Sequence, residues 1–431
     1  MATRLIGRIR AWSAGLAILS VVTATQAGTP TYRFTKLVDS TTPIPEGSGT
    51  FLSLNLAAID ANGDIAFTAS DVNNDYSVYA IRDGVLEKIA DHSDVIPGTT
   101  EHYDGFQHPL IQNGKTWWKG FKRFGLETHE VLVQSDGADA TLLVDTNNTQ
   151  VPGEPLGTTF EYINNRTDIK GDTLTFAAGW GDPENIEGGI FDLEGGVISP
   201  VVRFGDLAPN GDPFGRQMAV TGVDRQSDRI GFSSWTASGG YGIFVSNNGT
   251  LTKIVDQTTT IPGTTNVFEE VDDSGAIDGG WVTFLGLGSN GLGLYLHDGN
   301  QIQTIADTST ALSNGNTIES IGLYTLNNGM IAFTAYSNTT SELLLWRDGA
   351  LHSVVKSGDL IDGQVVWYIT YIHVRGFTGN YLAANIGFTN GTEAIYRIEI
   401  DTCGPAGDLD CDGDVDLADY ALFAQNFTGP M

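Results

Sequence analysis

The sequence is poor in cysteine and in basic residues. Of its 431 residues only two are cysteine, Cys403 and Cys411, and both lie near the C-terminus. Disulfide bonds therefore cannot hold the preceding four hundred residues together. Lysine and arginine number 22 against 52 aspartate and glutamate residues, a formal net charge of −30. Because phosphate binding requires clustered basic side chains, this balance argues against nucleic acid as a partner.

Long apolar runs are also scarce. The one candidate, "AWSAGLAILSVVTATQA", follows Arg4, Arg8 and Arg10 and ends in small residues, which is typical of a secretory signal peptide cleaved after Ala27. The run is short for a spanning helix and is interrupted by Ser, Thr and Gln; a membrane anchor is the alternative. We therefore expect a signal peptide over residues 1–27, an extracellular or cell-surface location, and no membrane span after cleavage.

The long middle part of the chain lacks sustained helical periodicity and contains a repeat instead. The segment "ANGDIAFTAS" at 61–70 recurs as "NNGMIAFTAY" at 327–336, with weaker copies between them. Each copy is followed by a strand-like run ending in Asp-Gly or Asn-Gly, such as "VYAIRDG", and then by a unit-ending run such as "KIADHSDVIPG". Short runs rich in β-branched residues predict strands, and Asn-Gly or Asp-Gly predicts two-residue hairpin turns. Each unit should therefore hold four short strands.

The period of the repeat predicts the architecture. The unit-ending positions are 49 to 58 residues apart and fall at Asp39, Asp91, Asp145, Arg203, Asp256, Asp307 and Lys356. Four strands in about fifty residues is the size of a propeller blade. Six units are complete over 51–356, and a seventh, at 365–400, has only three strands. Near the N-terminus, "RFTKLVDSTTPIPEG" matches a unit ending with no unit before it.

We therefore predict an all-β fold: a seven-bladed β-propeller over residues 28–400, closed by its N-terminal strand. Pairing the spare strand with the incomplete unit removes an unpaired sheet edge. A row of separate four-stranded modules, or an open solenoid, is the alternative, and it leaves both the spare strand and the incomplete unit unexplained.

The repeat motif carries a family resemblance. The runs at 62–67 and 328–333 resemble those of exported bacterial tandem-repeat proteins named for an NxxGxxxxAF motif. The resemblance covers about 350 residues. It implies an exported, surface-associated protein and implies no reaction.

The C-terminal segment 401–431 contains "GDLDCDGDVDLADYALFAQNF". With Asp408 as position 1 of a twelve-residue loop, aspartates also fall at positions 3, 5, 9 and 12, and Gly413 falls at position 6. That spacing is the one by which an EF-hand loop surrounds Ca²⁺ with oxygen ligands. A short helix should follow, because apolar residues from Leu417 to Phe427 recur at helical spacing. An acidic linker is the alternative.

The tail also resembles one repeat of a bacterial type I dockerin. This resemblance implies calcium ligands at Asp408, Asp410, Asp412, Asp416 and Asp419 and at the carbonyl of Asp414. It further implies docking to a cohesin-like or other cell-surface protein. A dockerin has two such repeats and this chain has one, with Leu417 and Ala418 at positions where dockerins often carry polar recognition residues. The two cysteines, eight residues apart, could form a disulfide or remain free thiols.

Sequence motifs for catalysis are missing. The chain has no Gly-x-Ser-x-Gly elbow, phosphate-binding loop or His-Glu-x-x-His site, so it identifies no catalytic residue. His102, His108 and His129 form a loose group, which fits either a transition-metal site or polar loop histidines. Tryptophans at strand positions fit either sugar stacking or packing.

We therefore expect a secreted, non-catalytic binding or scaffold protein. The propeller would present a face to a ligand, a partner or a glycan, and the tail would be a calcium-dependent docking tag. The alternative is a carbohydrate-active enzyme, a hydrolase acting on polysaccharide glycosidic bonds, delivered by the dockerin-like tail. A surface-layer structural repeat is a third possibility.

Overall fold

The computed structural model describes residues 30–401, apart from residues 126, 138, 182–184 and 290, together with residues 417 and 420. Residues Pro30–Asp401 form one compact unit. Its regular elements in the described residues are all β-strands, which confirms the predicted all-β class. No described helix has the length and apolar character needed to cross a membrane.

Six consecutive four-stranded antiparallel sheets make up blades 1 to 6. Their strands, in chain order and four to a blade, are β2 (Ser53–Ile59), β3 (Ile65–Ser70), β4 (Tyr76–Arg82), β5 (Val85–Ala90); β6 (Gly105–Gln112), β7 (Lys115–Phe124), β8 (Glu127–Ser135), β9 (Ala140–Asp145); β10 (Phe160–Lys170), β11 (Thr173–Trp180), β12 (Glu187–Glu194), β13 (Val197–Arg203); β14 (Phe214–Val223), β15 (Arg229–Thr236), β16 (Gly240–Asn247), β17 (Thr250–Asp256); β18 (Glu270–Asp278), β19 (Trp281–Gly288), β20 (Gly291–His297), β21 (Ile302–Asp307); and β22 (Ser320–Asn327), β23 (Met330–Ser337), β24 (Thr340–Arg347), β25 (Ala350–Lys356).

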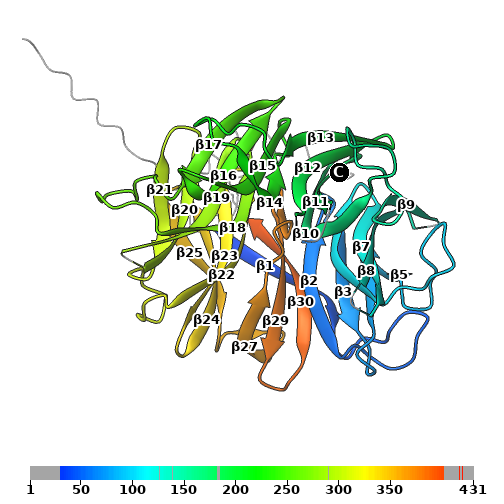
Figure 1. The fold of residues 1–431 in the computed structure, drawn as a ribbon. Helices are drawn as coiled ribbons and strands as arrows, with labels where there is room; N and C mark the ends of the chain where they lie inside the picture. The colour runs from blue at the N-terminus through cyan, green and yellow to red at the C-terminus, as the bar shows by residue number, and fades with distance from the viewer. Residues whose placement is uncertain are drawn as a thin grey trace, which may run out of the picture. The chain divides into compact units, whose positions relative to one another are not determined.

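Blade 7 joins the two ends of the propeller. Its strands are β1 (Thr31–Asp39), β26 (Leu360–Ile361), β27 (Gln364–Tyr371), β28 (Phe377–Thr378), β29 (Tyr381–Phe388) and β30 (Glu393–Asp401). The N-terminal strand β1 pairs antiparallel with β30, and Figure 1 shows the blue β1 beside the orange β30. The predicted seven-bladed propeller closed by its N-terminal strand is therefore confirmed.

The hairpin turns follow the predicted chemistry. Asp83-Gly84 and Asn248-Gly249 both have two consecutive positive φ angles, 50° and 77° in the first and 48° and 79° in the second. Such turns match the twist of the flanking strands, and Asn, Asp and Gly are the residues that tolerate them. These Asp-Gly and Asn-Gly pairs therefore mark the positions of the hairpin turns.

The phenylalanine of the repeat motif is a packing residue. In blade 3, Phe160 meets Phe176 and Phe191 edge-on at ring-centroid distances of 5.8 and 5.2 Å, and Phe176 stacks on Phe191 at 5.7 Å. Equivalent triads recur in blades 1, 4 and 5. Aromatic pairs in these geometries add to the stabilisation from burial alone. The repeat motif therefore encodes the blade core rather than a binding site.

The strand tryptophans differ in burial. Trp117, Trp118, Trp180 and Trp346 are buried. Trp235 and Trp367 are exposed. Packing therefore accounts for most of the strand tryptophans.

Candidate functional site

The first strands of blades 1 to 6 and the turns after them, together with residues 373–378 of blade 7, line two chambers, and we call the space that contains them the channel. One chamber has a volume of about 180 Å³ and receives side chains from blades 2 to 7. We call it the histidine chamber and define it by His108, Arg166, Asp168, Thr221, Ser274 and His373. These six residues come from five different blades, so only the closed ring brings them together.

A break in the inner strand of blade 7 positions His373. Strand β27 ends at Tyr371 and β28 begins at Phe377, where the repeat pattern predicted one continuous strand. The backbone turns here because Gly376 N–H donates to the carbonyl of His373 at 2.7 Å. A Cβ at Gly376 would lie 2.8 Å from that carbonyl oxygen, so the turn requires glycine. The neighbouring carbonyl of Val374 accepts a hydrogen bond from Thr325 Oγ1 of blade 6 at 2.8 Å.

His373 is a buried, neutral hydrogen-bond donor. Its Nδ1 accepts the backbone N–H of Arg375 at 3.0 Å, so the ring proton of the neutral form belongs on Nε2. Burial, with the nearby His108 and Arg375, lowers the pKa of His373 to about 3. The ring is therefore uncharged at neutral pH.

His108 lies beside it, with ring centroids 6.4 Å apart. Strand β6 has an irregular register between Gln107 and Leu110, and His108 adopts a φ of 46°. This left-handed conformation is uncommon for a residue other than glycine. Burial, with the charges of Lys119 and Arg166, lowers the pKa of His108 to about 4. The chamber thus holds two neutral imidazoles side by side.

The other charged groups of the histidine chamber are paired. Arg375 binds the carboxylate of Asp168 through Nε and Nη2, and the backbone N–H of Val223 donates to Asp168 Oδ2 at 2.6 Å. Arg166 forms an ion pair with Asp273 at 3.1 Å. In the described part of the chain, His108 and His373 are therefore the ionisable residues of this chamber that have no ion-pair partner.

An open groove of about 590 Å³ is lined by residues that neighbour those of the chamber in sequence. Tyr162 and Asn164 of β10 line the groove, and the next residues of the same strand, from 165 to 168, line the chamber. Asp273 lines the groove, and the next residue, Ser274, lines the chamber. Burial raises the pKa of the Asp273 carboxyl, opposed by the charge of Arg166, and Asp272 adds to the rise. The groove and the histidine chamber are therefore lined by neighbouring residues of the same strands.

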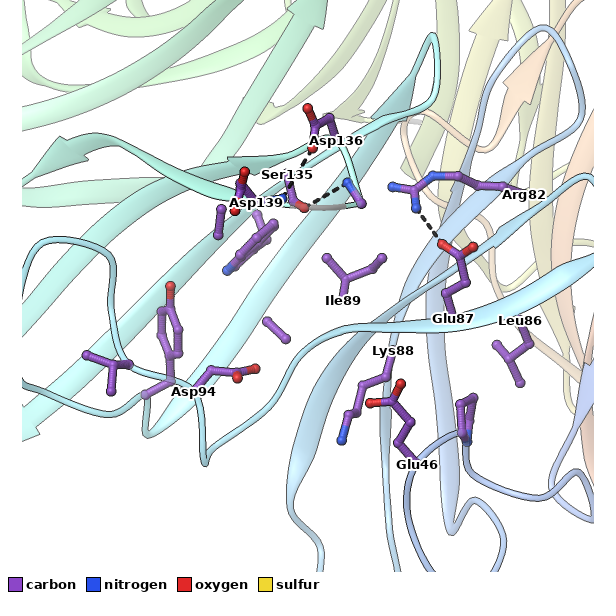
Figure 2. Close-up of a pocket in the computed structure, with 17 residues that line it drawn as sticks. Glu46, Arg82, Leu86, Glu87, Lys88, Ile89, Asp94, Ser135, Asp136 and Asp139 are labelled. Carbon is purple, nitrogen blue, oxygen red and sulfur yellow. Dashed lines mark hydrogen bonds and ion pairs between the residues drawn. The ribbon is translucent and has the colours of Figure 1, made fainter.

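A larger groove, of about 800 Å³, lies between blades 1 and 2 along β5 and the turn after β8 (Figure 2). Its charged side chains include Arg82, paired with Glu87 at 2.7 Å, and Lys88, which pairs with Asp91 at 2.7 Å. Ion pairs on an open, solvated rim contribute little and are common on protein surfaces. No histidine lines the described part of this groove, so we place the candidate site in the channel.

The structure separates the three histidines that the sequence grouped. His102 Nδ1 contacts the carbonyl of Ser93 at 2.8 Å, and His129 lies between Glu101 and Asp145 at 2.8 and 2.7 Å. His108 lies apart from both, in the channel. Among the residues described, no group of three or more His, Cys, Asp or Glu side chains is placed to hold a metal ion. The grouping was wrong because it relied on nearness in sequence.

The predicted calcium loop lies outside the described residues. This holds for all six proposed ligands, Asp408, Asp410, Asp412, Asp414, Asp416 and Asp419, and for both cysteines. Leu417 and Tyr420 are described, and both have helical backbone. Calcium binding, the partner of the tail and export therefore stay predictions.

The fold is a closed seven-bladed β-propeller, and the candidate site lies in its channel. Residues 59–374 match a family described as "Family of unknown function (DUF7453)". The match covers most of the chain, and the protein belongs to this family. This match supports neither the resemblance to dockerins nor the resemblance to the NxxGxxxxAF tandem-repeat proteins. No curated protein matches the sequence.

Solved structures share the fold. The β-propeller domain of the Trilobed protease from Pyrococcus furiosus is 12% identical, with 81% of this chain and 95% of that chain covered and a TM-score of 0.53. An acylaminoacyl peptidase from Pyrococcus horikoshii is 13% identical over 81% of this chain, with a TM-score of 0.50. The match covers 52% of that peptidase, so this chain spans about half its length.

These similarities correct one expectation. The similar propellers belong to peptidases, which are catalytic proteins, so the inference from a propeller to a non-catalytic binding or scaffold protein was wrong. At 12–13% identity the likeness shows the fold alone, and the chemistry of this chain has to be argued from its own residues.

Proposed function

We propose that this protein is a hydrolase whose active site is the histidine chamber. The observation that carries the proposal is the pair of neutral imidazoles, His108 and His373, with ring centroids 6.4 Å apart in a chamber whose other charges are paired. Perturbed pKa values in a cavity are typical of functional sites. That similar solved propellers belong to peptidases agrees with hydrolysis as the reaction class.

The two histidines suit different roles. His373 has Nδ1 occupied by the Arg375 N–H, so its Nε2–H can donate to the electronegative atom of the bond being cleaved. A neutral imidazole acts in this way in other enzymes. His108 has a neutral ring that can accept a proton from an attacking water and return it to the leaving group. Neither role needs a charged side chain. This fits a chamber in which the charged side chains already have ion-pair partners.

The carboxylates bear on the substrate class. Hydrolysis of glycosidic bonds commonly uses two carboxyl groups, one as acid and one as base or nucleophile. In the described residues, Asp168 of the chamber is held by Arg375, and Asp273 of the groove is paired with Arg166. We therefore place amide and ester bonds ahead of glycosidic bonds as the substrate.

The test is a hydrolysis screen of residues 28–431 with chromogenic esters, aminoacyl and peptidyl amides, and glycosides. We expect hydrolysis of an ester or amide, and a loss of at least about 100-fold in kcat/KM for His108→Asn and His373→Asn. Asparagine tolerates the positive φ at residue 108, so the first variant should fold. His352→Gln on β25, outside the channel, is the matched control and should keep the wild-type rate. Wild-type rates in both chamber variants, or no hydrolysis of any class, would refute the proposal.

A further inference from the structure

The second chamber of the channel also has a volume of about 180 Å³. We call it the arginine chamber and define it by Asp60, Gln112, Lys170, Arg225, Arg375 and Thr378. Gln112 and Lys170 are the last residues of β6 and β10, so this chamber lies where the inner strands end. Asp168 lines the histidine chamber and its partner Arg375 lines the arginine chamber, so their ion pair lies between the two.

Arg225 is the unusual residue of this chamber. Its Nη1 donates to the carbonyl of Phe377 at 2.8 Å and to Asn327 Oδ1 at 3.3 Å. In the described part of the chain, no carboxylate oxygen lies within ion-pair distance of its guanidinium. Burial and the neighbouring charge of Arg375, opposed by Asp278 and Asp168, lower the pKa of Arg225 to about 10. Arg225 is half-buried, and a charge withdrawn from water in this way is normally paired, because its desolvation is costly.

The carboxylate of Asp278 does not supply that partner. Its Oδ2 accepts the backbone N–H of Asn328 at 2.6 Å, and its Oδ1 faces the backbone N–H of Arg225 at 3.4 Å. Both oxygens are therefore directed at backbone groups. The charge of Arg375 is already matched by Asp168.

The remaining ionisable groups of the chamber have protein partners. Lys170 Nζ donates to the carbonyl of Ser227 at 2.6 Å and to Asp228 at 2.8 Å. Asp60 Oδ1 accepts the backbone N–H groups of Asn62 and Asp64 at 2.9 and 3.2 Å. Asp60 belongs to blade 1 and Arg225 to blade 4, so the two lie on different sides of the axis. The chamber thus presents an unpaired guanidinium on one side and a carboxyl group on another.

We propose that the arginine chamber binds a small hydroxy- or amino-carboxylate. Its carboxylate would pair with the guanidinium of Arg225, which suits the planar, forked donor geometry of arginine. Its hydroxyl or ammonium group would donate to Asp60. A multiply charged anion such as phosphate fits less well, because Asp60 would face its second charge. The site is separate from the histidines of the proposed active site.

The test is calorimetric titration of residues 28–431 with lactate, acetate and inorganic phosphate. We expect lactate to bind more tightly than acetate or phosphate. Arg225→Gln should weaken lactate binding at least about tenfold, as expected for loss of a charge-assisted hydrogen bond. Asp60→Asn should reduce the preference for lactate over acetate. Arg33→Gln, on the exposed surface of β1, removes a remote arginine and should bind lactate as the wild type does.

Folding is monitored by thermal unfolding of each variant. Should Arg225→Gln not fold, Arg225→Lys keeps the positive charge without the fork and should still lower lactate affinity. Undiminished lactate binding in the folded Arg225 variant would overturn the proposal. So would phosphate binding more tightly than lactate, or no binding of any of the three anions at millimolar concentration.

Discussion

At the scale of single residues, an aspartate at the end of an inner strand joins one blade to the next. Asp224, directly after β14, accepts hydrogen bonds from Gln226 N and Ser227 Oγ within its own turn at 2.9 and 2.8 Å. It also accepts the backbone N–H groups of Gly279 and Gly280 in blade 5 at 3.1 and 2.9 Å. Burial opposes these hydrogen bonds, which together lower the pKa of Asp224. The repeat pattern in the sequence does not show this link between blades.

Asp224→Ala should therefore destabilise the propeller more than the loss of an ordinary turn residue. It leaves two donors of the next blade without their acceptor, and we expect a loss of about 1–3 kcal/mol in the free energy of unfolding. The control is Asp298→Ala, because Asp298 bonds only within its own hairpin, to Asn300 N and Gln301 N. Urea denaturation measures both. Equal losses in the two variants would show that the blade-to-blade bonds contribute nothing.

At the scale of elements, strand β1 closes the ring of blades by pairing with β30. It pairs with β30 from Thr31↔Asp401 to Asp39↔Ala394, and Phe34 meets Tyr396 edge-on at 6.2 Å. Without β1 the long strand β30 would be an exposed edge, which favours aggregation. Closure therefore contributes both to stability and to solubility.

Deleting residues 28–40 should cause a large fall in melting temperature or aggregation, because the outer edge of blade 7 loses its partner. Differential scanning calorimetry and light scattering measure the two effects. Deleting residues 402–431 is the control, since residues 30–401 form a compact unit by themselves, and it should leave the melting temperature unchanged. A chain without residues 28–40 that melts like the intact protein would contradict the closed ring.

The strands and their closure could be predicted because they depend on local patterns. Asp83-Gly84 marks a turn, and the repeated phenylalanines mark a blade core, wherever they occur. The histidine chamber could not be predicted in the same way. His108 and His373 are 265 residues apart and meet only when the ring closes. The available signal was the run "IHVRG" in an otherwise apolar inner strand, where polar side chains break the repeat pattern.

At the scale of the whole molecule, the buried histidines should set the lower pH limit of stability. The folded protein holds the pKa values of His108 and His373 near 4 and 3, well below the ordinary histidine value of 6.5. Below about pH 6.5 the unfolded chain binds protons that the folded chain does not. The stability linked to these groups is therefore complete above about pH 6.5 and is lost as the pH falls toward 4. Asp39 and Asp91, with pKa values of about 2, add a second loss below about pH 4.

The measurement that tests the account most directly is an NMR titration of the protein with isotope-labelled histidine rings, from pH 8 to pH 5.5. The chain has seven histidines, and His108→Asn and His373→Asn assign the two signals of interest. We predict that both rings remain neutral throughout this range, with the proton of His373 on Nε2. Protonation of both rings near pH 6.5 would contradict the account, because the channel would then hold two ordinary solvated histidines rather than two buried, neutral imidazoles.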